Sequence, residues 1–171
     1  MKKGYIQLYT GNGKGKTTAA LGLSLRNICA GGKVYFGQFM KGQDCSELKA
    51  PEYLPGLTME QYGTSKYVKD KPSPEDIRAA EEGFARAEAA LLSGQYDLIV
   101  LDEINTALFY GLLSLQRVLE LLDKKPEPVE LVLTGRYAPS ELIDRADLVT
   151  EMKEIKHYYN TGVLARRGIE Y

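Results

Sequence analysis

The sequence has no tryptophan, one histidine and two cysteines among its 171 residues. Cys29 and Cys45 are too few for a disulfide framework and stand at no metal-ligand spacing. We interpret them as buried or incidental thiols of a protein in a reducing compartment. With a single histidine, no pattern of nucleophile, base and orienting residue is visible. A reaction that depends on positioning and charge stabilisation is therefore favoured over side-chain acid–base chemistry.

Excess charge and long apolar runs are also missing. The formal net charge is −1, which argues against sequence-independent binding of nucleic acid, because such binding needs a net basic face. No apolar run reaches the roughly 18 residues of a membrane span, and residues 1–4 lead directly into a strand-like segment. We therefore expect a cytoplasmic protein that binds neither nucleic acid nor membrane. Its length and balanced composition predict one globular domain over residues 1–171.

Short apolar runs alternate with helical patterns along the chain. The predicted strands are residues 5–9, 33–39, 96–101, 129–133 and 148–152. The predicted helices are residues 16–30, 74–93 and 112–122. This alternation predicts an α/β fold with a mostly parallel sheet and the ligand at the carboxyl edge of its strands. Residues 40–72 contain no recognisable element, and we interpret this stretch as a functional loop that faces a second substrate.

A glycine-rich turn lies between the first predicted strand and the first predicted helix. It reads Thr-Gly-Asn-Gly-Lys-Gly-Lys-Thr over residues 10–17. Its glycines allow backbone N–H groups to converge on phosphate oxygens, and the helix N-terminus adds the positive end of its dipole. Lys16 can reach the outer phosphates, and the Thr17 hydroxyl can bind Mg²⁺. Although Thr10 stands where the phosphate-loop motif has its first glycine, the context predicts a P-loop NTPase-like domain of three layers.

An acidic pair follows the strand at residues 96–101. Asp102 and Glu103 are expected beside the phosphate loop, because parallel strands end at the same edge of a sheet. With Thr17 they form a predicted Mg²⁺ site. These features do not choose among a kinase, an ATPase, a switch and a transferase.

Five further segments are more specific to one family than the phosphate loop and the acidic pair. They are Gln-Phe-Met-Lys-Gly at 38–42, Leu-Asp-Glu at 101–103, Thr-Gly-Arg at 134–136, Ile-Lys-His at 155–157 and Gly-Ile-Glu-Tyr at 168–171. Together with the loop at 11–20, they make the sequence resemble the P-loop family of ATP:corrinoid adenosyltransferases over nearly the whole chain.

The resemblance implies a reaction in which a corrinoid, reduced to Co(I), attacks the 5′ carbon of ATP and expels triphosphate. No protein base is required for this step. The ATP-binding residues implied are Gly11, Asn12, Gly13, Lys14, Gly15, Lys16, Thr17, Thr18, Arg26, Tyr110 and Arg136. Of these, Lys16 and Arg136 are expected to be catalytic, because a guanidinium after a strand suits phosphate. The resemblance also implies a homodimer and a flavoprotein reductant.

One departure from the family concerns the loop after the second strand. Bacterial members carry a phenylalanine and a tryptophan there, which displace the lower ligand of the cobalt. This chain has no tryptophan, so we expect Tyr62 or Tyr67 to face the corrinoid instead. His157 is interpreted as a packed or exposed residue of the C-terminal segment rather than a cobalt ligand.

Two alternatives to adenosyl transfer differ from it in their products. A P-loop ATPase or small-molecule kinase would release phosphate or a phosphorylated acceptor. A nucleotide-gated corrinoid-binding module would bind both ligands without turnover. The Gly-Ile-Glu-Tyr segment at 168–171 favours the transferase.

Overall fold

A computed structural model describes residues 3–64 and 71–171. Six strands form one sheet in the order β3-β2-β4-β5-β1-β6, and each pair of neighbouring strands is parallel. The strands are β1 Ile6–Thr10, β2 Val34–Phe39, β3 Leu57–Tyr62, β4 Leu98–Asp102, β5 Glu130–Thr134 and β6 Leu148–Glu151. The predicted parallel α/β sheet is therefore confirmed.

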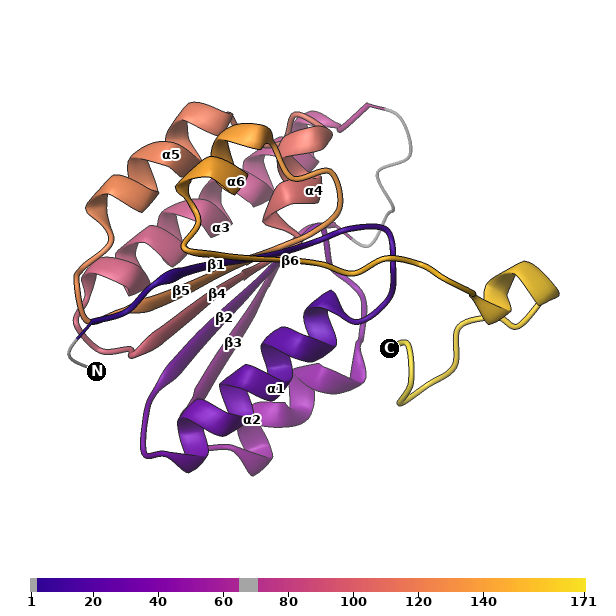
Figure 1. Cartoon of the computed structure of the whole chain (residues 1–171), viewed down its shortest axis with the longest axis horizontal. Coiled ribbons are helices and arrows are strands. Elements are labelled where there is room, and N and C mark those ends of the chain that lie inside the picture. Colours follow the sequence, from indigo (N-terminus) through magenta and orange to yellow (C-terminus); the bar gives the residue numbers. More distant parts are fainter. Residues whose placement is uncertain (1–2, 65–70) are drawn as a thin grey trace.

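Helices cover both faces of this sheet and complete three layers (Figure 1). On one face lie α1 Lys16–Cys29 and α2 Ala50–Tyr53. On the other lie α3 Pro74–Leu92, α4 Ile104–Phe109, α5 Leu115–Lys124 and α6 Ser140–Arg145. Within the described ranges no helix is both long and apolar enough to cross a membrane.

The core is divided between the two faces because successive side chains of a strand point to opposite sides. Leu8 of β1 packs toward α3–α6, whereas Tyr9 packs on the α1 side. Strands β2 and β4 are buried along their whole length. This burial explains their nearly continuous apolar sequences.

The prediction that residues 40–72 form a loop is wrong for much of the stretch. It contains a 3₁₀ turn at Ser46–Lys49, helix α2 and the edge strand β3. In β3 only the end residues Leu57 and Tyr62 are buried. An edge strand whose middle residues are only partly buried shows little apolar pattern, and pairing with β2 decides its conformation.

Two short helices, α4 and α6, escaped prediction because each has six residues and too few turns for a periodic pattern. The helix predicted over 112–122 begins later, at α5, where the Ser114 hydroxyl accepts a hydrogen bond from the Arg117 N–H. The other predicted helices agree with α1 and α3 to within one or two residues.

Two features of the topology determine the site. Strand β5 lies between β1 and β4, so the phosphate loop and the acidic pair follow strands that are not neighbours. After β6 the chain leaves the sheet, and its far end returns toward the N-terminal end of α1 (Figure 1). The carboxyl edge of the sheet and the end of the chain therefore share one region.

Candidate functional site

The phosphate loop connects β1 to α1 and starts one residue later than the motif suggests. Thr10 is still in β1, where its carbonyl accepts a hydrogen bond from the Met152 N–H at 2.8 Å. The turn begins at Gly11, with φ +94°, and ends at Gly15, with φ +120°. Residues with a Cβ rarely adopt these angles. The first glycine is displaced, therefore, because Thr10 extends the strand.

Lys16 fills the centre of this loop. Its Nζ donates hydrogen bonds to the carbonyls of Gly11 and Gly13, at 2.8 and 2.9 Å. The side chain is buried, and desolvation lowers the pKa of its ammonium group, with a further contribution from Arg136. A polyanion would relieve both effects, because it adds negative charge next to a desolvated cation.

Asp102 lies at the end of β4 and is completely buried. Its carboxylate accepts hydrogen bonds from Thr17 Oγ1 at 2.9 Å, Thr134 Oγ1 at 2.7 Å and Gln38 Nε2 at 3.2 Å. Burial, and then the neighbouring Glu103, raise the pKa of this carboxyl group. Several hydroxyl and amide donors therefore hold a desolvated carboxylate next to the first turn of α1.

Glu103 stands at the start of α4 in a left-handed conformation, with φ 60°. Its N–H donates to Thr134 Oγ1 at 3.0 Å, and its carboxylate accepts a hydrogen bond from Thr106 Oγ1. This conformation is uncommon for a residue with a side chain and is often found at functional sites. It separates the directions of the two adjacent carboxylates, so that Glu103 lines the pocket while Asp102 stays beneath it.

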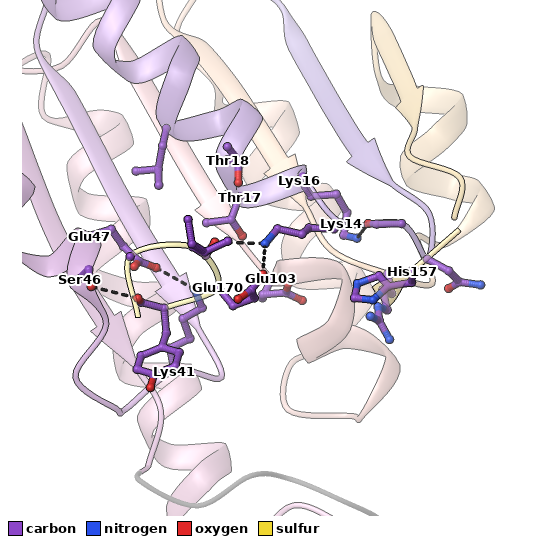
Figure 2. A pocket seen from close by; sticks show the side chains of 18 residues that line it. Lys14, Lys16, Thr17, Thr18, Lys41, Ser46, Glu47, Glu103, His157 and Glu170 are labelled. Carbon is purple, nitrogen blue, oxygen red and sulfur yellow. Dashed lines mark hydrogen bonds and ion pairs between the residues drawn. The ribbon is translucent and has the colours of Figure 1, made fainter. Parts of the chain in front are cut away.

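A polar pocket of about 550 Å³ lies over these residues. Figure 2 shows side chains from the phosphate loop, the segment after β2 and the end of the chain around it. Its lining comprises Asn12, Gly13, Lys14, Gly15, Lys16, Thr17, Thr18, Leu21, Lys41, Ser46, Glu47, Glu103, Arg136, His157, Gly168, Ile169, Glu170 and Tyr171.

Lys41 adds a further cation from the segment after β2. Its Nζ lies 3.0 Å from Glu47 and 4.0 Å from Asp102. Desolvation opposes its charge, but Asp102 and Glu47 outweigh that effect and raise the pKa of Lys41. Lys16, Lys41 and Arg136 therefore bring positive charge to one pocket from three elements of the fold.

The end of the chain lies across the pocket between the phosphate loop and Ser46 (Figure 2). Lys14 Nζ donates to the Glu170 carboxylate at 2.8 Å and to the Ile169 carbonyl at 3.1 Å. On the opposite side, Ser46 Oγ donates to a main-chain oxygen of Tyr171 at 2.9 Å. Residues 168–171 thus form one wall of the pocket.

The oxygen atoms near Thr17 suit Mg²⁺. Among residues 3–64 and 71–171, no three or more His, Cys, Asp or Glu side chains are grouped to hold a metal by themselves. Mg²⁺ in nucleotide sites needs fewer protein ligands, because it takes one or two carboxylates together with phosphate oxygens and water. The Thr17 hydroxyl and the carboxylates of Asp102 and Glu103 fit that pattern.

Most of the predicted nucleotide residues come together at this pocket. Gly11 and Asp102 contact lining residues from beneath. Arg26 does not reach the pocket, because it lies in the exposed last turn of α1, about 15 Å along the helix from Lys16. Tyr110 follows α4 and packs edge-on against Phe109, with ring centroids 5.3 Å apart, outside the lining.

Tyr62 is not exposed to a second substrate in this structure. Its side chain is 2% exposed and packs in the core against Phe39, while its hydroxyl group contacts Glu60 at 3.0 Å. The expectation that it faces the corrinoid is corrected, since β3 turns the ring toward α3. Tyr67 lies outside the described residues.

Several pocket residues were not assigned to a binding site from the sequence. They are Lys41, Ser46, Glu47, His157 and residues 168–171. The sequence does carry a signal for most of them. The segments that contain Lys41, His157 and residues 168–171 are among those that carry the family resemblance. His157, interpreted from the sequence as a packed or exposed residue of the C-terminal segment, is half-buried at the pocket; its Nδ1 accepts a hydrogen bond from the Tyr159 N–H at 3.0 Å.

The sequence is similar to known proteins along nearly its whole length. The corrinoid adenosyltransferase of a Sinorhizobium species is 34% identical over 174 residues, covering 99% of this chain and 81% of that protein. The Pseudomonas aeruginosa corrinoid adenosyltransferase is 35% identical over 175 residues (99% and 85% of the two chains). The Escherichia coli K12 enzyme of the same name is 32% identical over 170 residues (99% and 87%). Residues 2–171 match the family described as ATP:corrinoid adenosyltransferase BtuR/CobO/CobP, and the chain belongs to this family.

Proposed function

We propose that this protein transfers the 5′-deoxyadenosyl group of ATP to the Co(I) of a corrinoid and releases triphosphate, in the synthesis or salvage of adenosylcobalamin. One observation carries the proposal. In a chain of the corrinoid adenosyltransferase family, a single pocket combines a phosphate loop, four cationic side chains and Thr17, which is hydrogen-bonded to Asp102.

The residues present would bind the triphosphate at several points. Backbone N–H groups of the loop and the N-terminus of α1 face the pocket, where Lys14, Lys16 and Arg136 add charge. Thr17, Asp102 and Glu103 would hold Mg²⁺, which supplies neutralisation of the phosphate charge. Lys16 and Arg136 stabilise negative charge as triphosphate leaves, and this is their proposed catalytic role.

The chemical step balances without a protein base. The electron pair of Co(I) forms the cobalt–carbon bond at C5′ of ATP, and the C5′–O bond breaks. Its electron pair leaves with triphosphate. Because no proton moves, the protein needs to orient the two substrates and stabilise the leaving group. A single histidine and a pocket with several cations suit this demand.

The assembly that we propose is a cytoplasmic homodimer of one-domain chains. Apolar side chains of the C-terminal segment support it, since Ile155 is 85% exposed and Leu164 73% exposed. Exposed apolar side chains that form a contiguous patch mark protein–protein interaction sites. Replacing both with serine should convert the dimer to a monomer in sedimentation experiments. We assign the reduction of the corrinoid to a separate flavoprotein, as the family resemblance implies.

An anaerobic assay tests the reaction. Purified protein is mixed with Mg·ATP and chemically reduced cob(I)alamin, while the corrinoid spectrum and triphosphate are followed. The expected result is adenosylcobalamin with one equivalent of triphosphate. Release of the terminal phosphate alone would instead identify an ATPase or kinase. Tight binding of both ligands without product would identify a binding module.

A further inference from the structure

An exposed pair of stacked aromatic rings lies beside the pocket. Phe109 ends α4 and Tyr137 follows β5, and their ring centroids are 4.2 Å apart with an interplanar angle of 29°. Phe109 is 58% exposed and Tyr137 is 49% exposed. We call Phe109 and Tyr137 the aromatic platform. Two large rings that stack on one another and remain open to solvent indicate a surface that binds another ring or apolar face.

The backbone that presents the platform is in an unfavourable conformation. Tyr137 has φ 58°, in the left-handed region that a bulky residue rarely adopts. The side chain stacks on Phe109 but the residue is 49% exposed, so burial in the core does not explain a large residue there. A strained aromatic residue at the edge of a binding pocket suggests a functional reason for the side chain.

Each of the two platform residues is linked to the pocket through a nearby residue. Arg136, which precedes Tyr137, lines the pocket. Thr106 lies one helical turn before Phe109; its Oγ1 donates to the Glu103 carboxylate and accepts a hydrogen bond from the Arg136 N–H at 3.2 Å. The rings therefore have a defined position relative to the phosphate and metal ligands.

The position of the platform distinguishes between the two substrates. The pocket of about 550 Å³ is lined mostly by polar and charged groups and suits triphosphate, whereas neither platform residue lines it. A corrinoid is much larger than this pocket and must lie on the open surface at its mouth. Resting on the proposed function, we propose that the platform binds the corrinoid, by stacking against the apolar, conjugated face of its macrocycle.

Steady-state kinetics with chemically reduced cob(I)alamin test the platform. The variants are Phe109→Ala and Tyr137→Gly, with Tyr53→Ala as a control for loss of an exposed aromatic ring on the opposite face of the sheet, where Tyr53 is 78% exposed. We expect each platform variant to raise the KM for corrinoid about three- to tenfold. The KM for ATP should not change, and Tyr53→Ala should behave as wild type.

Thermal unfolding and equilibrium binding complete the test. Tyr137→Gly should unfold at the wild-type temperature or higher, because glycine tolerates φ 58°. Unchanged corrinoid KM in both variants overturns the proposal, as does a raised ATP KM, which would place adenine on the rings. Dissociation of an oligomer by these variants would also overturn it. Binding of cob(II)alamin, measured without turnover, must weaken in parallel, so the platform is tested even if wild type forms no adenosylcobalamin.

Discussion

Thr17 Oγ1 lies 2.9 and 3.1 Å from the two carboxylate oxygens of Asp102, although the strands that precede these residues are separated by β5. The intervening strand takes part in the contact, because Thr134 at its end donates to the same carboxylate at 2.7 Å. The proposed metal site is thus assembled across three strands.

Removal of the Thr17 hydroxyl should lower the Mg²⁺-dependent rate without preventing the protein from folding. Thr17→Ala is expected to lower the Mg²⁺-dependent rate of adenosyl transfer about 100-fold, a typical loss for one electrostatic contact in the transition state. Thr17→Ser keeps the hydroxyl and should retain most of the rate. Initial rates measured across a Mg²⁺ titration give the comparison, and equal rates for both variants would exclude Thr17 as a ligand.

Lys16 should be required for catalysis more than for stability. Lys16→Met keeps the length of the side chain but removes the charge near the leaving triphosphate, and we expect turnover to fall about 100- to 1,000-fold. Folding should survive, because the ammonium group is desolvated and its removal relieves that penalty. Single-turnover kinetics and thermal unfolding measure the two effects. A fully active Lys16→Met enzyme would contradict the assignment.

Gly83 in α3 should resist substitution in spite of helix propensity. An added Cβ would meet the Cγ of Tyr62 at 2.1 Å, and the Tyr62 hydroxyl is anchored to Glu60. Overpacking costs about 1–3 kcal/mol, which exceeds the gain of about 0.5–1 kcal/mol from glycine to alanine in a helix. Gly83→Ala should therefore lower the free energy of unfolding in urea.

Gly22 in α1 is the matched control for Gly83. A Cβ there meets nothing within 4 Å, so Gly22→Ala should raise the free energy of unfolding by about 0.5–1 kcal/mol. Equal effects at the two glycines would show that the Tyr62 ring moves aside easily.

The contact of Glu170 with the phosphate loop predicts an unusual titration. Hydrogen bonds from Arg166, then Lys14 and Tyr158, hold the pKa of this carboxyl group well below its usual value of 4.5. A depressed carboxyl pKa stabilises the folded state above the unfolded pKa, and this contribution is lost as pH falls through the folded pKa. The wall formed by residues 168–171 should therefore stay in place at pH 4.5 and detach only in stronger acid.

NMR of the Glu170 carboxyl carbon tests this expectation. The midpoint should lie below 4.5 in wild type and move toward 4.5 in Lys14→Met. High salt should shift it in the same direction, because the charges of Lys14 and Arg166 are exposed to solvent and therefore screened. An ordinary midpoint in wild type would mean that the contact with Lys14 does not persist in solution.

Much of this protein could be determined from local sequence. The glycines of residues 11–15 and the continuous apolar residues of β2 and β4 report backbone and burial requirements directly. These patterns predict the parallel α/β fold, the phosphate loop and the acidic pair, since each depends on residues that are close together in the sequence. The segment Gly-Ile-Glu-Tyr at 168–171 also marked the family, although its place in the fold was not evident.

Tertiary structure alone decided which distant residues meet. Strand order puts β5 between β1 and β4, the edge strand β3 turns Tyr62 inward, and the helical rise of α1 carries Arg26 away from the pocket. The return of residues 168–171 to Lys14 and the stacking of Phe109 on Tyr137 are likewise contacts between separate elements. Local propensity favours the conformation of most single elements. Which elements become neighbours is decided by long-range packing, which depends on the whole chain.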